Sequence, residues 1–188
     1  MTGPRRSLTA EALRELMEEL ARTAPRDGPF SVYLIGGGTA VLAGWRSATL
    51  DADLYGDRQD VFRDVQGIKE RLRLNVEFVR PEHFVPPLAG SADRHRFIAR
   101  VGAIDFYHYD PYAQLLSKLV RGFRKDLADA RNFVASGWVD PARFRALVDS
   151  IPEADWSAYP TLSRAAVLSV VDAFLADLDP AVPDGTEL

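Results

Sequence analysis

Three consecutive glycines, Gly36 to Gly38, directly follow the apolar run 30–35. Such a run predicts a buried strand, and the residues after the glycines, 39–45, predict a short helix. Glycine has no Cβ, so it lets a backbone turn sharply or come very close to a neighbour. One or two glycines would suffice for a tight turn alone. The triplet therefore predicts a strand–turn–helix unit whose turn lets the backbone approach a ligand closely.

The first 110 residues alternate between the patterns of helices and strands. Apolar residues at helical spacing predict a helix from Thr9 to Arg22 and another after Asp57, whose stripe is Val61, Val65, Ile68 and Leu72. Further strands are expected at 51–55, 74–79 and 97–109, the last as one strand or as two halves bent at Gly102. The proline- and glycine-containing segment 81–96 is expected to be a long loop that borders the functional site.

From Asp110-Pro111 onward the pattern is helical, beginning with a capping carboxylate followed by proline. We predict helices at 112–136, from Asp140 onward, and at 163–178. Because short helices are unstable alone, they should pack on the first half. The predicted fold class is therefore α+β, with a mixed α/β core at 1–110 that contains a small mixed sheet flanked by helices. A helical C-terminal portion at 111–188 packs on that core.

Composition excludes several kinds of site and partner. The chain has no cysteine, which excludes disulfides, thiolate zinc sites and cysteine nucleophiles. Its three histidines, His83, His95 and His108, are scattered, and its net charge of −4 argues against coating nucleic acid by bulk electrostatics. No apolar run approaches the roughly 20 residues that span a bilayer. Glu11 and Arg14 interrupt the pattern of a signal peptide. We therefore expect a cytoplasmic protein without a membrane partner.

Two carboxylates, Asp51 and Asp53, lie two residues apart in a predicted strand, so both leave the same face. They repel each other, and a cation between them offsets that repulsion. Carboxylate oxygens suit Mg²⁺, which typically takes one or two protein carboxylates together with substrate phosphates. Taken alone, such a pair is more typical of a solvated strand end. The glycine triplet favours a site, because glycines between a strand and a helix let the backbone approach a phosphate.

Two familiar phosphate loops do not fit the triplet. A Walker loop needs lysine after its last glycine, where this chain has Thr39, and the dinucleotide fingerprint needs a glycine where Val41 stands. The turn Ile35-Gly36-Gly37 and the pair Asp51-Ala52-Asp53-Leu54, separated by thirteen residues, instead resemble the nucleotidyltransferase superfamily. That superfamily includes DNA polymerase beta-like and antibiotic-modifying enzymes.

The likeness extends to small, uncharacterised bacterial nucleotidyltransferases and to abortive-infection toxin-like members. It covers roughly residues 30–140 and rests further on the segments Arg46-Ser47, 75–78, 84–87, 108–111 and 117–122. Ala52, between the two carboxylates, is smaller than the usual Ile or Val. The resemblance implies a nucleotidyltransferase-like core.

The resemblance also implies a Mg²⁺- or Mn²⁺-dependent enzyme. Such an enzyme moves a nucleoside monophosphate from a nucleoside triphosphate, for example ATP, to an acceptor hydroxyl. RNA such as tRNA, a protein and a small molecule are all open as acceptors. The toxin-like members imply a toxin–antitoxin or phage-defence role, with a toxin or antitoxin as partner protein.

The resemblance assigns residues as well. Asp51 and Asp53 would bind the metal, and a third catalytic carboxylate would come from Glu77 or Asp105, with Glu77 slightly favoured by its place on the next strand. The nucleotide would contact Gly36, Gly37, Gly38, Thr39, Arg46, Ser47, Lys118 and Arg121.

The basic residues allow a second interpretation. Lys118, Arg121 and Lys125 follow one another at helical spacing and predict a basic ridge that neutralises the triphosphate. The ordinary alternative is a solvated face paired with Asp126 and Asp129. Two other functions also stay open. A catalytically silent nucleotide-binding or toxin/antitoxin partner module on the same fold would bind a triphosphate without transfer. A metal-dependent phosphohydrolase would release inorganic phosphate.

Overall fold

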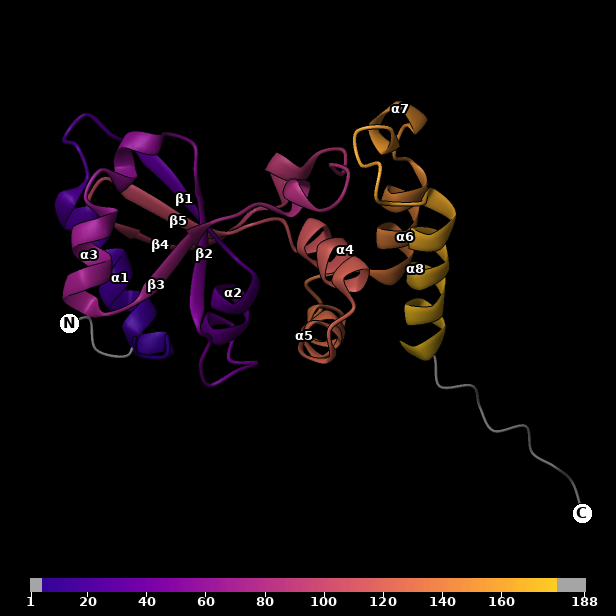
Figure 1. The fold of residues 1–188 in the computed structure, drawn as a ribbon, viewed down its shortest axis with the longest axis horizontal. Coiled ribbons are helices and arrows are strands. Elements are labelled where there is room, and N and C mark those ends of the chain that lie inside the picture. The colour runs from indigo at the N-terminus through magenta and orange to yellow at the C-terminus, as the bar shows by residue number, and fades with distance from the viewer. Residues whose placement is uncertain (1–4, 179–188) are drawn as a thin grey trace, which may run out of the picture.

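A computed structural model describes residues 5–178. The last ten residues of the predicted helical portion, 179–188, and residues 1–4 lie outside the described residues. Five strands form one mixed sheet, and helices pack around it and beside it (Figure 1). The predicted α+β class is therefore confirmed. The strands are β1 (Phe30–Ile35), β2 (Asp51–Gly56), β3 (Asn75–Phe78), β4 (Arg96–Val101) and β5 (Ile104–His108).

The sheet has the order β3-β2-β1-β5-β4. The central strand β1 runs antiparallel to β2 and parallel to β5, β2 runs parallel to β3, and β4 is an antiparallel edge strand. Alternate residues of β1 and β2, such as Val32 and Leu54, are buried on one face. Because strand side chains alternate between faces, Asp51 and Asp53 lie on the other face. The sheet thus separates an apolar core from the carboxylates.

Helices α1 (Ala10–Thr23), α2 (Gly36–Leu42) and α3 (Val65–Leu72) cover the apolar face. Helix α1 begins after Thr9, whose hydroxyl accepts a hydrogen bond from the Ala12 amide, a typical N-cap. Its buried stripe includes Leu13, Leu16 and Leu20, which belong to the same hydrophobic cluster as the inner residues of the sheet. This cluster forms the core of the N-terminal half.

A second hydrophobic cluster holds the C-terminal helices together. These are α4 (Pro111–Arg121), α5 (Arg124–Ala135), α6 (Pro141–Asp149), α7 (Glu153–Trp156) and α8 (Arg164–Leu178). They lie beside the sheet in Figure 1, on the side opposite α1 and α3. Ile35, Tyr33 and Trp45 of the N-terminal half also belong to this cluster. The division at residue 110 stays a prediction, and the second core crosses it.

Three element bounds differ from the sequence-based expectations. The helix expected at 112–136 is two helices, because Gly122 has φ +67° and ends α4. The segment 97–109, expected as one strand or as two halves bent at Gly102, is the hairpin β4–β5, which turns at Gly102 with φ +57°, so the second alternative is confirmed. Helix α2 begins at Gly36 rather than at residue 39. The helix expected after Asp57 is a 3₁₀ turn, Gln59–Phe62, followed by α3.

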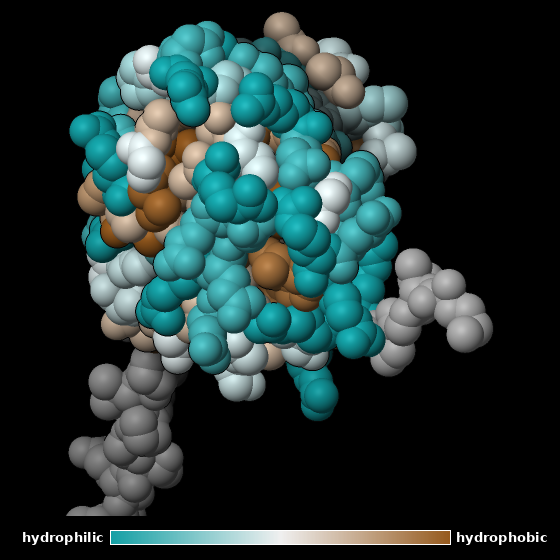
Figure 2. Space-filling view, turned by 90° about the vertical axis from the view of Figure 1, so that its left-hand side faces the viewer, coloured by the Kyte–Doolittle hydropathy of each residue, from teal (hydrophilic) through white to brown (hydrophobic). Residues whose placement is uncertain are grey.

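The surface of the N-terminal half is mainly hydrophilic in the view of Figure 2, with apolar side chains gathered in separate areas. Within residues 5–178, no helix is long and apolar enough to cross a membrane. The segment expected as a loop at 81–96 contains two short 3₁₀ turns, Pro81–His83 and Ser91–Arg94. Arg94 ties it to the start of α4, since its guanidinium donates to both carboxylate oxygens of the buried Asp110.

Candidate active site

The carboxylates of Asp51, Asp53 and Glu77 lie on neighbouring strands. In the parallel register of β2 and β3, Asp51 is opposite Asn75 and Asp53 is opposite Glu77. The Asn75 side-chain amide donates to Asp51 Oδ1 at 2.5 Å and to Glu77 Oε1 at 3.3 Å. The strand register therefore brings Asp51 and Asp53 close to Glu77, and the Asn75 amide links Asp51 to Glu77.

The surroundings of Asp53 disfavour the ionised form of its carboxyl group. Burial raises its pKa from 3.8 to about 6, and the nearby charges of Glu77 and Asp51 add to this effect. Arg121 and Lys118 act in the opposite direction without cancelling it. A carboxylate held in this way is stabilised by a cation that binds beside it.

The glycine turn lies against this carboxylate. Gly36 has φ +59°, which favours glycine, and a Cβ there would lie 2.7 Å from Asp53 Oδ2. A Cβ at Gly37 would overlap the hydroxyl of Thr49 and would lie 2.8 Å from the Thr49 Cβ. Two of the three glycines are therefore required, because the turn packs closely against Asp53 of β2 and against Thr49, two residues before that strand.

A buried hydrogen-bond chain fixes the turn from behind. Gln114 of α4 accepts from the Gly36 amide at 2.8 Å through Oε1, and its Nε2 donates to the Tyr109 carbonyl. The Thr39 hydroxyl donates to the Leu34 carbonyl at 3.0 Å. Its oxygen can therefore accept from Gln114 Nε2 and from His108 Nδ1, both at 3.3 Å. Helix α4 thereby holds the glycine turn in place through side chains that water does not reach.

Helices α4 and α5 place basic groups opposite the acids. Lys118 is buried and its ammonium contacts Asp129 at 2.5 Å and Asp126 at 3.3 Å. Arg46, from the segment between α2 and β2, forms a two-pronged pair with Asp129, with Nη2–Oδ2 at 2.6 Å. Arg121 Nε lies 3.4 Å from Asp126 Oδ2. The sequence suggested that Asp126 and Asp129 pair with the basic ridge, and in the structure Lys118 is one of the residues that they pair with.

These groups surround one cavity of about 430 Å³. Asp51, Asp53 and Glu77 line its sheet side, whereas Lys118, Arg121 and Lys125 line its helix side. Arg46, Gly36, Gly37 and Thr49 complete the lining near the turn. The cavity therefore has an acidic side and a basic side that face each other.

Four of the predicted residues lie outside this cavity. Asp105, the alternative third carboxylate, is next to Ser31 in the β1–β5 register, far along the strand from Ile35, which is next to Asp53. It pairs with Arg100 at 2.6 Å, which lowers its pKa. Gly38, Thr39 and Ser47 are also absent from the lining. Gly38 and Thr39 are buried in the core, so we leave these four residues out of the proposed site.

Several lining residues were missed by sequence reasoning. Thr49 lies between the Arg-Ser pair and the acids and gave no signal of its own. Phe84 and Phe123 line the cavity and are 41% and 59% exposed, and the Arg121 guanidinium lies 5.9 and 5.7 Å from their ring centres. Phe84 lies in the segment expected as a loop, where an aromatic residue was an available signal, whereas Phe123 fell inside the helix expected at 112–136 and gave none.

The donor set fits a hard divalent cation completed by a substrate. Within residues 5–178, no group of three or more His, Asp or Glu side chains forms a ready-made metal site. Mg²⁺ commonly uses only one or two protein carboxylates and takes its other oxygens from water and phosphate. Asp51 and Asp53 meet that requirement, and the pKa of Asp53 stays raised because the nearby Lys118 and Arg121 do not offset its burial and its carboxylate neighbours.

Comparison with known proteins gives one match. A family model described as "Nucleotidyltransferase of unknown function (DUF6036)" matches residues 11–167, which is most of the chain. The match covers the glycine turn, both strand acids, Glu77 and helices α4 and α5. No curated protein and no solved structure matches.

Proposed function

Because the chain belongs to this family of nucleotidyltransferases of unknown function, we propose that it transfers a nucleoside monophosphate from a nucleoside triphosphate to an acceptor hydroxyl. The proposal includes dependence on Mg²⁺ or Mn²⁺ bound by Asp51 and Asp53. The acceptor would be an RNA, a protein or a small hydroxylated molecule. A role beside a toxin or antitoxin partner belongs to the same proposal.

The two-sided charge of the cavity carries the proposal. Three carboxylates face four cationic side chains across about 430 Å³, and Asp126 is the one acid on the basic side of the lining. A metal-bound triphosphate has the matching pattern, since its cation suits the acids and its phosphates suit the basic groups. Arg121 and Lys125 are best placed to contact phosphates. Asp129 holds Lys118 and Arg46 at 2.5 and 2.6 Å, whereas Arg121 has a longer contact, of 3.4 Å, with Asp126.

In the proposed reaction, the acceptor oxygen bonds to the α-phosphorus while the bond from that phosphorus to the bridging oxygen breaks and pyrophosphate leaves. Glu77 takes the proton of the acceptor hydroxyl, as the carboxylate of this group that holds no metal. A bound divalent cation would supply charge neutralisation to the phosphates. Arg121 and Lys125 hold the departing pyrophosphate, and the rings of Phe84 and Phe123 provide apolar faces for stacking of the base.

The experiment is a transfer assay with the four α-labelled nucleoside triphosphates, total RNA and cell extract, with Mg²⁺, Mn²⁺ or EDTA. We expect labelled acceptor only in the presence of a divalent cation, and at least a roughly 100-fold loss in both Asp51→Asn and Asp53→Asn. Asp105→Asn is the matched control, because it removes a strand carboxylate outside the cavity. It should retain transfer.

Three outcomes would overturn the proposal. Undiminished transfer by Asp53→Asn would remove the metal role of that residue. Release of inorganic phosphate in place of pyrophosphate would indicate a phosphohydrolase. Triphosphate binding that stabilises the protein, without label in any acceptor, would indicate the catalytically silent module.

A further inference from the structure

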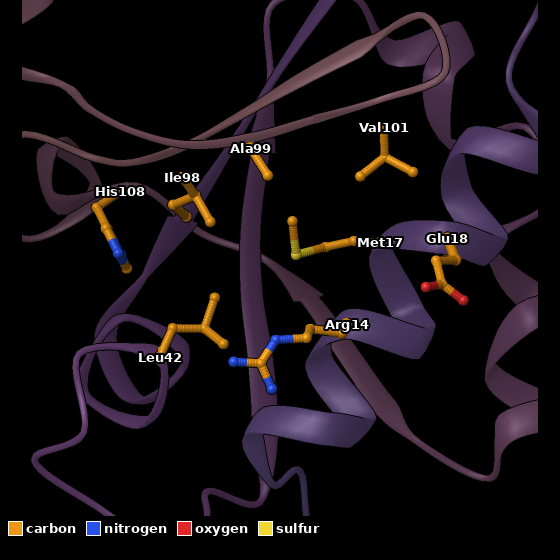
Figure 3. A pocket seen from close by; sticks show the side chains of 8 residues that line it. All are labelled: Arg14, Met17, Glu18, Leu42, Ile98, Ala99, Val101 and His108. Carbon is orange, nitrogen blue, oxygen red and sulfur yellow. The ribbon is translucent and has the colours of Figure 1, made fainter.

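A second cavity, of about 450 Å³, lies on the apolar face of the sheet, away from the carboxylates. Figure 3 shows Ile98, Ala99 and Val101 of β4 along one side and α1 along the other, with Leu42 and His108 at one end. The three β4 side chains are only partly buried. Edge strand β4 therefore has an apolar surface that α1 does not fully cover. A volume of this size is typical of small-ligand sites.

The polar groups around this cavity are unequally distributed. Arg14 and Glu18 lie one turn apart on α1, yet among residues 5–178 neither forms an ion pair. In Figure 3 the Arg14 guanidinium points toward Leu42 and the end where His108 lies, whereas Glu18 lies near Val101 at the other end. Arg96 is next to His108 in the β4–β5 register; its guanidinium lies over the Trp138 ring, 4.4 Å from the ring centre, so a second positive charge lies behind His108. The His108 end therefore favours an anion.

One wall of this cavity is connected to the glycine turn. His108 lines the cavity, and its Nδ1 lies 3.3 Å from the Thr39 hydroxyl. Thr39 accepts from Gln114 at 3.3 Å, and Gln114 accepts from the Gly36 amide at 2.8 Å. These four residues form a continuous buried chain from the second cavity to the turn that lies against Asp53. A ligand that moves the His108 ring would disturb this chain.

We propose that the cavity between α1 and β4 binds a small molecule with an apolar body and a carboxylate, and that its occupancy is felt at the Gly36 turn. The apolar body lies on Met17, Ile98 and Val101, and Arg14 binds the carboxylate. This site does not depend on the proposed transfer reaction, since it shares no lining residue with the first cavity.

Calorimetric titration of the full-length protein with octanoate tests the site. We expect one octanoate per chain, and a loss of affinity of at least about 10-fold in Arg14→Gln, as for one charge-assisted hydrogen bond. Arg14 is exposed on its helix, so the variant should fold. Arg26→Gln, which changes another exposed arginine, in a loop, is the matched control and should bind as the unaltered protein does. Acetate, which lacks the apolar body, and octylamine, which has the opposite charge, should not bind.

Equal octanoate affinity in Arg14→Gln, or tighter binding of octylamine or acetate, would overturn the assignment of the ligand. The connection to the turn has its own readout in amide NMR spectra. The Gly36 resonance should shift as octanoate is added, whereas that of Gly90, in the loop before the 3₁₀ turn 91–94, should stay. A Gly36 resonance that does not move while octanoate binds would overturn the coupling and leave the site. Neither measurement uses nucleotide, so failure here is distinct from failure of the transfer assay.

Discussion

Asp53 is a residue whose ionised state opposes folding. Its carboxyl is desolvated and lies beside Glu77 and Asp51, so its pKa is about 6 in the folded protein against 3.8 in an unfolded chain. Well below pH 3.8 the group is neutral in both states and imposes no penalty. As the pH rises from about 4 to about 6, the unfolded chain loses the proton first, and the folded state becomes less favoured. This penalty is fully present at neutral pH.

Asp53→Asn should therefore stabilise the metal-free protein at pH 7. Each pKa unit corresponds to about 1.4 kcal/mol, so the shift from 3.8 to about 6 gives an expected gain on the order of 3 kcal/mol in the free energy of unfolding. Urea denaturation in EDTA at pH 7 and pH 4 measures it, and at pH 4 the gain should fall below about 1 kcal/mol. Asp105→Asn is the control and should not stabilise, because Arg100 lowers the pKa of that carboxyl. No gain for Asp53→Asn at pH 7 would contradict this account of the site.

The third carboxylate can be assigned by comparing two isosteric substitutions. Glu77 lies next to Asp53 in the strand register and lines the cavity, whereas Asp105 lies outside it. Glu77→Gln should reduce the transfer rate at least about 100-fold, the range that general-base residues contribute, with little change in stability because the side chain is exposed. Asp105→Asn should change the rate less than about 3-fold. The reverse ranking in the label-transfer assay would assign the role to Asp105.

At the scale of elements, the break between α4 and α5 decides where the basic groups point. Gly122 ends α4 in a left-handed conformation, and α5 then turns back so that Asp126 and Asp129 face Lys118. One continuous helix at 112–136 would have placed those acids further along the same rod. The helix pair thus fixes Lys118 and Arg46 through ion pairs with Asp129, and Arg121 and Lys125 line the cavity beside them. This arrangement orients the basic side without a ligand.

Removing Asp129 should destabilise the helix pair strongly. Lys118 and Arg46 both contact this carboxylate, and in Asp129→Ala the buried Lys118 would keep only Asp126, at 3.3 Å. Breaking a buried pair costs about 3–5 kcal/mol, because it leaves a charge without adequate compensation. Asp177→Ala removes an exposed partner of Arg131, also on α5, and should cost less than about 1 kcal/mol. Similar urea midpoints for the two variants would contradict the proposed role of the ion network.

For the whole molecule, the sequence predicted what depends on local pattern. The strand before Gly36, the shared face of Asp51 and Asp53, and the capping role of Asp110 all follow from spacing of a few residues. The positions of residues whose surroundings come from distant segments of the chain could not be predicted in this way. Thr39 is buried because His108 and Gln114 converge on it from β5 and α4. No local pattern indicates such a contact.

The second hydrophobic cluster contains residues from both sides of the predicted boundary at residue 110, so the two halves are not expected to fold independently. Ile35, Val85 and Leu88 come from before this position, yet they are buried together with Leu115 and Phe133 from after it. Residues of the first half therefore complete a core that mainly belongs to the second. Stability of the glycine turn also depends on Gln114, beyond the boundary.

A fragment that ends at residue 110 should therefore fail to fold cooperatively. It keeps the five strands but loses α4, so Ile35, Val85, Leu88 and Tyr109 would be exposed to water and the Gly36 amide would lose Gln114. Exposure of several large apolar side chains costs about 1.5–3 kcal/mol each, which is comparable with the total stability of a small domain. We expect the full chain to unfold in one urea transition followed by circular dichroism, and the fragment to show a broad transition and strong binding of an apolar fluorescent dye. A sharp transition of the fragment at the same urea concentration as the full chain would contradict this prediction. It would show that the first core folds cooperatively by itself and that the second cluster does not add to its stability.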